Sequence, residues 1–220
     1  MRPKIGMLEQ IRNKFRFVPI SLFLIGAGCL NVASAPATVT KPVEAPPLAT
    51  KTYSDTNLGF TVQYPDDLTP IVDRVKMRLT GYIPACDPDH AIVCFPLDTS
   101  AYSGTNFESA AFGVQMRDDL KGQAACAAPS NGETALGVAT INGTAFNVFS
   151  LSDSGAGHHA EGQNFRVFRD KNCLELSTRI DTMAFENWPP GTIKRFTEGD
   201  QAIVQLILDG MRKSFTFEAA

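Results

Sequence analysis

Histidine and carboxylate side chains gather between residues 153 and 161, in a pattern that could serve metal or acid–base chemistry. His158 and His159 are adjacent, and Asp153 and Glu161 lie close by. Neutral imidazole is a common metal ligand. Neighbouring residues of an extended strand point to opposite faces, so both histidines reach one ion only from a loop. Nearby glycines favour a loop, and His90, which follows two aspartates, could complete the site if the fold brings the segments together.

Two interpretations of this segment remain open. The simpler one is a solvated, hydrogen-bonding loop over residues 152–162, and the alternative is a metal-dependent or hydrolytic enzyme that uses residues 153–161. Ser154 lies beside Asp153 and near His158, but closeness in sequence does not establish triad geometry. The chain contains no G-x-S-x-G, H-E-x-x-H or G-x-x-x-x-G-K-S/T motif. We therefore assign no catalytic residue and expect no cofactor, except a divalent metal under the alternative.

Four cysteines fit two disulfides. The chain has five cysteines, and Cys29 lies in an apolar N-terminal segment, which leaves an even number. Four cysteines in an exported chain are typical of two disulfides. Three pairings are possible, and we favour Cys86 with Cys94 and Cys126 with Cys173. No C-x-x-C motif supports a thioredoxin-type redox role.

The first 37 residues have the layout of a signal peptide. Five basic residues precede a mostly apolar run over residues 17–30, and small residues follow at 33–35. The run is shorter than the roughly 20 residues that span a bilayer, so cleavage is favoured over a transmembrane anchor. Alternatively, Gly26-Ala-Gly-Cys29 resembles a lipobox, with a signal that ends at residue 28 and a lipid on Cys29. Either signal places the protein in the bacterial periplasm or cell envelope, or outside the cell.

A proline-rich tether over residues 38–52 is expected to lead into a single domain over residues 53–220. The whole chain has a formal net charge of -3, and the part after the basic N-terminal segment is more acidic. An acidic domain is a poor nucleic-acid binder. Nucleic acid is therefore not an expected partner, and membrane contact is expected only through an N-terminal anchor.

Alternating and turn-forming patterns predict antiparallel strands. Period-two runs predict strands over residues 58–64 and 110–117. Asn-Gly at 142–143 predicts a two-residue hairpin, and Asp-Lys-Asn at 170–172 predicts a second hairpin. Residues 118–134 are expected to form a polar loop with one helical turn near its cysteine.

A helix is predicted near the C-terminus. A capping-box pattern at 197–200 precedes an amphipathic stretch over 201–213. Its apolar face is expected to hold Ile203, Leu206, Ile207 and Met211. The order of elements favours an α+β fold, with an antiparallel sheet of short strands and hairpins covered by this helix. Three nearby basic residues are expected to be solvated charges at a strand edge, namely Arg166, Arg169 and Lys171.

The first strand of the domain resembles a known family. Residues 53–65 read Tyr-Ser-Asp-Thr-Asn-Leu-Gly-Phe-Thr-Val-Gln-Tyr-Pro, which is similar to the opening strand of the PsbP-like superfamily of exported α+β domains. The closing helix and its Phe-Thr-Phe strand are similar too. The named members are mostly non-enzymatic subunits or partner-binding adaptors, so the resemblance implies a binding role. We therefore expect an exported envelope protein with a non-catalytic binding or scaffold domain, whose partner is an envelope protein or a small ligand.

Overall fold

The computed structural model describes residues 49–77 and 82–218. Its strands are β1 (Thr50–Asp55), β2 (Phe60–Pro65), β3 (Ala91–Pro96), β4 (Phe107–Met116), β5 (Glu133–Ile141), β6 (Thr144–Gly155), β7 (His158–Arg169), β8 (Asn172–Met183) and β9 (Thr216–Phe217). Its α-helices are α1 (Arg74–Met77), α2 (Gly122–Cys126) and α3 (Glu198–Ser214). Within these residues, no helix is both long and apolar enough to cross a membrane.

The N-terminal predictions fall mostly on residues that lie outside this part of the chain. The expected signal peptide, Cys29 and most of the tether precede residue 49. β1 begins at Thr50 and pairs with β2, where Thr50 lies opposite Pro65. The end of the tether expected over residues 38–52 is therefore part of a strand.

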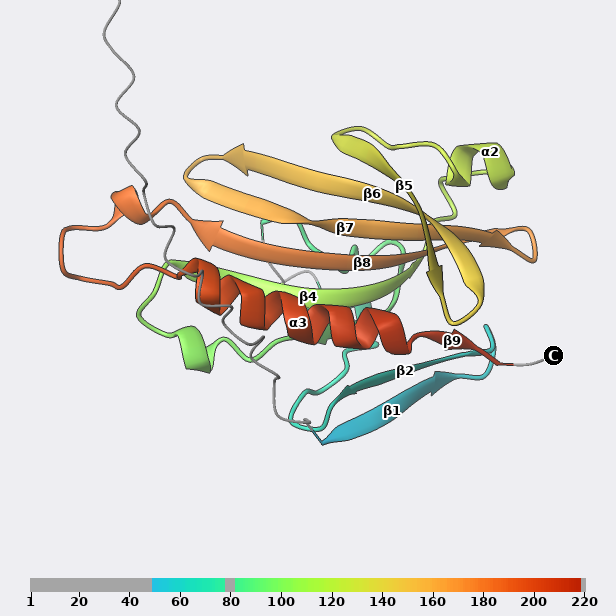
Figure 1. Ribbon diagram of the computed structural model, residues 1–220, viewed down its shortest axis with the longest axis horizontal. Helices are drawn as coiled ribbons and strands as arrows, with labels where there is room; N and C mark the ends of the chain where they lie inside the picture. Colours follow the sequence, from blue (N-terminus) through green and yellow to red (C-terminus); the bar gives the residue numbers. More distant parts are fainter. Residues whose placement is uncertain (1–48, 78–81, 219–220) are drawn as a thin grey trace, which may run out of the picture. The chain divides into compact units, whose positions relative to one another are not determined.

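The strands form two antiparallel sheets, which confirms the antiparallel α+β class (Figure 1). The larger sheet has six strands in the order β3-β4-β8-β7-β6-β5, and β1, β2 and β9 form the smaller sheet. β6, β7 and β8 are each 12 residues long. The expectation of one sheet of short strands is wrong in these two respects.

Three tight turns connect the long strands. The predicted hairpin turn at 142–143 is confirmed, and the hairpin predicted at 170–172 is confirmed with a turn of two residues, 170–171; both residues of each turn have positive φ. A third turn at 156–157 joins β6 to β7, so the loop expected over residues 152–162 is wrong. Ala156 adopts a φ of 51° and Gly157 a φ of 83°. Alanine rarely adopts this conformation, which is why the residue types at 156–157 are a weak signal for a hairpin turn.

α3 begins at a capping box, as its sequence predicts. The Thr197 hydroxyl accepts a hydrogen bond from the Asp200 amide at 3.1 Å, and the Asp200 carboxylate accepts one from the Thr197 amide at 2.9 Å. These contacts satisfy amide donors that the first helical turn leaves unpaired.

The expected apolar face of α3 is confirmed in part. Met211 is buried and Ile207 packs partly buried against the core, as expected. Val204 and Leu208 complete the buried face, whereas Ile203 and Leu206 are 55% and 49% exposed. Both sets fit helical spacing because the helix is apolar around much of its circumference. Which of these residues are buried depends on how α3 is rotated against the sheets. The spacing of apolar residues does not determine this rotation.

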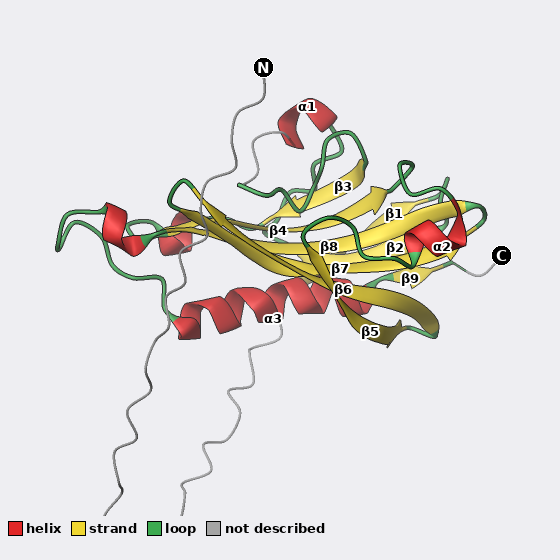
Figure 2. Cartoon of the chain, turned by 90° about the horizontal axis from the view of Figure 1, so that it is seen from above, coloured by secondary structure: helices red, strands yellow, loops and turns green. Residues whose placement is uncertain are grey.

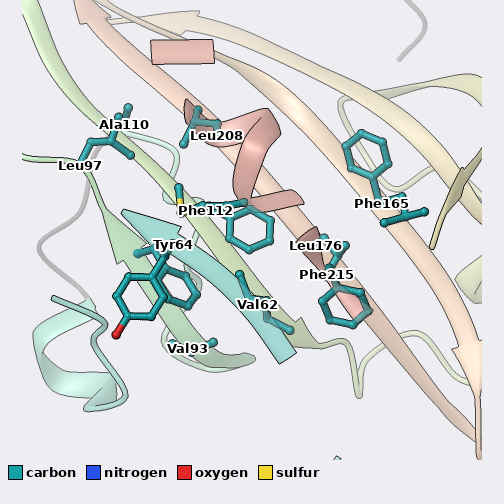
Figure 3. Close-up of a cluster of buried hydrophobic side chains, with 14 of the residues drawn as sticks. Val62, Tyr64, Val93, Leu97, Ala110, Phe112, Phe165, Leu176, Leu208 and Phe215 are labelled. Atoms are coloured by element: carbon teal, nitrogen blue, oxygen red, sulfur yellow. The ribbon is translucent and has the colours of Figure 1, made fainter. Parts of the chain in front are cut away.

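The apolar core lies on one face of the larger sheet. Phe112 of β4 and Leu176 of β8 pack with Val62 of β2, Leu208 of α3 and Phe215 (Figure 3). All five are at most 1% exposed, and full burial of one such side chain contributes about 1.5–3 kcal/mol. Figure 2 shows α1 and α3 on opposite sides of the larger sheet. The face of the larger sheet that points away from α3 therefore packs against other segments of the chain.

Candidate functional site

The face of the larger sheet that points away from α3 carries buried charged and polar side chains; we call it the charged face. On β8, Glu175, Ser177 and Arg179 alternate with residues of the apolar core, because successive strand residues point to opposite faces. Glu175 is 2% exposed, Arg179 is 5% exposed and Arg166 of β7 is 0% exposed. A buried charge is unfavourable unless it is paired and hydrogen-bonded.

Arg166 lies between two carboxylates. Its Nε donates to Glu175 Oε2 at 2.5 Å, and its Nη2 donates to Glu133 Oε1. Arg117 Nη1 also donates to Glu175 Oε2, at 2.9 Å. The expectation that Arg166 is a solvated edge charge is wrong, because β7 is an inner strand of the sheet and this face is covered.

Arg117 also holds a second carboxylate at the margin of the charged face. Its Nε and Nη2 donate to the two oxygens of Asp119 at 2.9 and 2.8 Å. These hydrogen bonds lower the pKa of the Asp119 carboxyl to about 2 and raise the pKa of Arg117. Arg117 therefore joins the buried Glu175 to a half-exposed acid.

Two disulfide-bonded segments cover the charged face. The disulfides join the pairs favoured from the sequence, Cys86 with Cys94 and Cys126 with Cys173. The second disulfide ties α2 to β8 and so holds residues 118–132 against the sheet. There Ala128 O accepts a hydrogen bond from Arg166 Nη1 at 3.1 Å. The segment thus covers the buried guanidinium and also supplies one of its partners.

The other covering segment, residues 82–90, is attached through a side-chain amide. Gln115 Nε2 donates to Ala85 O at 2.9 Å, and Gln115 Oε1 accepts from the Asp87 amide at 3.2 Å. A Cβ at Gly113 of β4 would lie 2.3 Å from Ala85 O. Only glycine at this position lets the segment approach the strand so closely.

A cavity of about 570 Å³ lies between the covering segments and the charged face; we call it the polar cavity. Its volume falls within the range of small-molecule sites. Its charged and amide-bearing lining residues are Asp87, His90, Gln115, Arg117, Asp119, Asn131, Glu133, Asp153, Asn164, Glu175 and Arg179. The arrangement can bind a polar ligand through several hydrogen-bond donors and acceptors.

The predicted metal-binding residues lie in several separate places in the structure. His90 and Asp153 line the polar cavity. His158 and His159 line a second cavity, of about 490 Å³, at the 156–157 turn. Glu161 accepts a hydrogen bond from Gln201 of α3. These residues therefore do not surround one common point.

The two adjacent histidines have different partners. His158 Nδ1 lies 2.8 Å from Glu108 Oε2, and its ring stacks on Tyr82 at a centroid distance of 5.1 Å. His159 Nδ1 lies 2.8 Å from Ser154 Oγ, across the β6–β7 pair. Because they occupy successive positions of a strand, their side chains point to opposite faces.

Ser154, His159 and Glu161 form a row that has the residue types of a hydrolase triad. His159 Nε2 lies 3.6 Å from Glu161 Oε2, beyond hydrogen-bond distance. Ser154 is exposed on a regular strand pair, whereas the nucleophile elbow of hydrolases is a sharp strand-to-helix turn. The row can exchange a proton between serine and histidine, but it lacks a close carboxylate to orient the imidazole.

A different set of residues could hold a cation. His90, Asp118 and Asp119 each offer one ligand atom, and these atoms lie within 4.8 Å of one another. His90 Nδ1 is 2.9 Å from Asp118 Oδ1. However, both oxygens of Asp119 already accept hydrogen bonds from Arg117. Arg117 therefore already supplies to the Asp119 carboxylate the positive charge that a bound cation would supply.

Sequence reasoning missed the residues that dominate the charged face, Arg117, Glu133, Arg166, Glu175 and Arg179. A signal for part of this set was present. Glu175, Ser177 and Arg179 follow one another with period two in the strand expected after the hairpin turn at 170–172, which places them on one face. Polar residues with this spacing are usually solvent-exposed, so the spacing by itself favours a solvated face.

Comparisons with known proteins gave the following results. No family model matches the chain, and no curated protein matches it. Among solved structures, the chain is similar to the solution structure of cyanobacterial PsbP (CyanoP) from Synechocystis sp. PCC 6803. The match has a TM-score of 0.40 and 10% sequence identity, and it covers 82% of this chain and 99% of that chain.

Proposed function

We propose that this chain is an exported, disulfide-bonded and non-catalytic domain that binds a small polar ligand in the polar cavity. The observation that carries the proposal is the cavity itself. Polar and charged side chains line this half-open space, and two cross-linked segments form part of its walls. Walls held in place lose little freedom when a ligand binds, which favours affinity.

Export is supported by features of the sequence. The basic, apolar and small-residue regions of the first 37 residues follow in the order of a signal peptide. Disulfides are maintained in oxidising compartments, and all four cysteines after Cys29 are paired. Lipidation of Cys29 would add a membrane anchor to the same domain.

The hydrolytic alternative has less support. The imidazole of His159 is shared with an exposed serine, and Glu161 is engaged by Gln201 rather than by the imidazole. A metal-dependent reaction would need the predicted ligands to converge, but they are divided between two cavities, and Glu161 instead contacts Gln201 of α3. A binding role requires neither arrangement.

The test is a native intact mass of the protein isolated from its own cell envelope under non-reducing conditions. We expect one small adduct per chain, together with the mass deficit of two disulfides. A variant that fills the cavity, Leu151→Trp, should lose the adduct, because Leu151 lines the cavity and lies in register with Glu133 and Arg179 on the charged face. Ser103→Trp places the same side chain on an exposed residue outside the cavity and should keep it.

Two results would contradict the proposal. One is retention of the adduct by Leu151→Trp, which would place the ligand elsewhere. The other is a bare protein that also gives no thermal stabilisation with a broad set of polar metabolites. Crosslinking that captures a stoichiometric envelope protein at the cavity would instead support a protein partner, and would replace the small ligand.

A further inference from the structure

The polar cavity contains buried donors that have no acceptor. Among the described residues, the buried side-chain atoms without a hydrogen-bond partner include Arg179 Nε and Ser130 Oγ, and both residues line the polar cavity. An Nε–H group is a donor only, and a hydroxyl is both a donor and an acceptor. Buried groups of this kind are rarely left unpaired in proteins, so each requires an explanation, such as a bound ligand or water.

Arg179 also has no carboxylate in direct contact among the described residues, and Glu175, Glu133 and Asp181 act on its charge only from a longer distance. Its Nη1 donates to Thr178 O at 2.6 Å, and its Nη2 donates to Asn164 Oδ1 at 2.8 Å, and both acceptors are uncharged. Arg117 and Arg166, by contrast, each pair with two carboxylates. Arg179 forms no ion pair within the part of the chain that the structure describes. It is 5% exposed, and burial lowers its pKa, so a ligand that brings negative charge would offset an unfavourable burial.

Two aspartates of the polar cavity carry the opposite charge. Asp87 Oδ1 accepts the Asp89 amide at 2.9 Å, and Asp153 Oδ1 accepts the Ser154 amide at 2.7 Å. Neither carboxylate is in an ion pair with a described residue. A simple anion near Arg179 would be repelled by these acids, whereas a ligand with a positive group would be attracted to them.

We propose that the ligand of the polar cavity is a zwitterion of the amino-acid class, whose carboxylate binds Arg179 and whose ammonium group faces Asp87 or Asp153. This inference rests on the proposed function of the cavity. A guanidinium matches the planar geometry of a carboxylate, and Ser130 offers a further hydroxyl. The cavity of about 570 Å³ has room for a free amino acid or a short peptide, which share this chemistry.

The test measures binding to the full exported protein by calorimetry. The probes are L-alanine, L-glutamine and L-alanyl-L-alanine, with acetate, methylammonium and glucose as probes that carry one charge or none. We expect at least one zwitterion to bind at least about tenfold more tightly than acetate or methylammonium. Free amino acids and the dipeptide form separate arms, so the test also decides between these two sources of the zwitterion.

Variants then locate the two charges. Arg179→Gln is expected to weaken zwitterion binding at least about tenfold, and Asp153→Asn or Asp87→Asn several-fold. Arg195→Gln is the matched control, because Arg195 is an exposed arginine that lines the other cavity; it should bind normally. If Arg179→Gln fails to fold, Ser130→Ala and Asp153→Asn still test the site, because they leave the buried guanidinium in place.

The inference is overturned if no zwitterion saturates the protein below about 10 mM, or if Arg179→Gln and Arg195→Gln bind equally well. Its failure is distinguishable from failure of the proposed function. A neutral or singly charged native adduct that Leu151→Trp abolishes would leave the cavity as a binding site but refute the zwitterion. Absence of any adduct and of any binding would refute both.

Discussion

Replacing Arg166 with methionine should strongly destabilise the fold, although this residue was expected from the sequence to be solvated. The guanidinium is fully buried and pairs with Glu133 and Glu175. Methionine keeps much of the aliphatic volume and removes the charge. Glu175 would retain Arg117 as a partner, at 2.9 Å, whereas Glu133 forms no other ion pair among the described residues.

The expected magnitude follows from these contacts. Breaking a buried ion pair by removing one partner lowers the free energy of unfolding by about 3–5 kcal/mol. Arg166 also lies 4.7 Å above the Phe149 ring, a contact that contributes about 0.5–2 kcal/mol. Because Glu175 stays paired, we expect a total loss of about 3–5 kcal/mol, or a fall in Tm of roughly 6–20 °C for a domain of this size.

The assay is urea unfolding followed by far-ultraviolet circular dichroism at pH 7. Arg169→Met is the matched control on the same strand, because Arg169 is 42% exposed and its only ion pair among the described residues is with its neighbour Asp170. Arg169 also lies 4.3 Å from the centre of the Phe217 ring, so the control removes a cation–π contact as well. Its expected effect is within about 1 kcal/mol. Adding Glu133→Gln to Arg166→Met removes the stranded carboxylate and should restore part of the loss. A loss below about 1 kcal/mol for Arg166→Met, equal to that of the control, would refute the buried ion-pair interpretation.

Three further predictions concern stability. Cys126→Ser should lower the free energy of unfolding by about 4 kcal/mol and Cys86→Ser by about 2.5 kcal/mol, because the disulfides span 47 and 8 residues; equal losses in urea unfolding would contradict the chain-entropy reasoning. Thr197→Ala should remove the α3 cap and lower the free energy of unfolding by about 1 kcal/mol, which urea unfolding also measures. Burial raises the pKa of Asp181, so the folded protein binds this proton more readily than the unfolded chain, and stability is lost as the pH rises through the interval between the two pKa values. When the pH falls from roughly 7 to 4, the parent should therefore gain more stability than the variant Asp181→Asn, which has no carboxyl group at this position. Identical dependence of Tm on pH for the two proteins would show that Asp181 does not contribute.

The candidate site was less predictable from the sequence than the fold, and His158 and His159 illustrate the reason. Their residue types suggested shared chemistry, and the flanking glycines favoured a loop. The turn at 156–157 instead joins β6 directly to β7. The two histidines are therefore successive strand residues, and their imidazoles point to opposite faces. Residues that are adjacent in the chain were thereby separated, while Glu133 and Glu175 were brought to one guanidinium.

The sequence by itself determined the local features of this protein. The Asn-Gly turn at 142–143, the turn at 170–171 and the capping box at Thr197 depend on residues within a few positions of one another. The disulfide pairing was also favoured correctly. Short-range sterics and hydrogen bonding act in the same way wherever such a segment occurs, so these features could be inferred without the fold.

Only the tertiary structure decided which side chains are buried and what surrounds them. Period two places Glu175 and Arg179 on one face of β8 but does not say whether water or protein covers that face. The covering segments come from residues 82–90 and 118–132, far from β8 in the sequence, and disulfides hold them there. Burial, ion pairing and the polar cavity all result from this long-range packing, which no local pattern encodes.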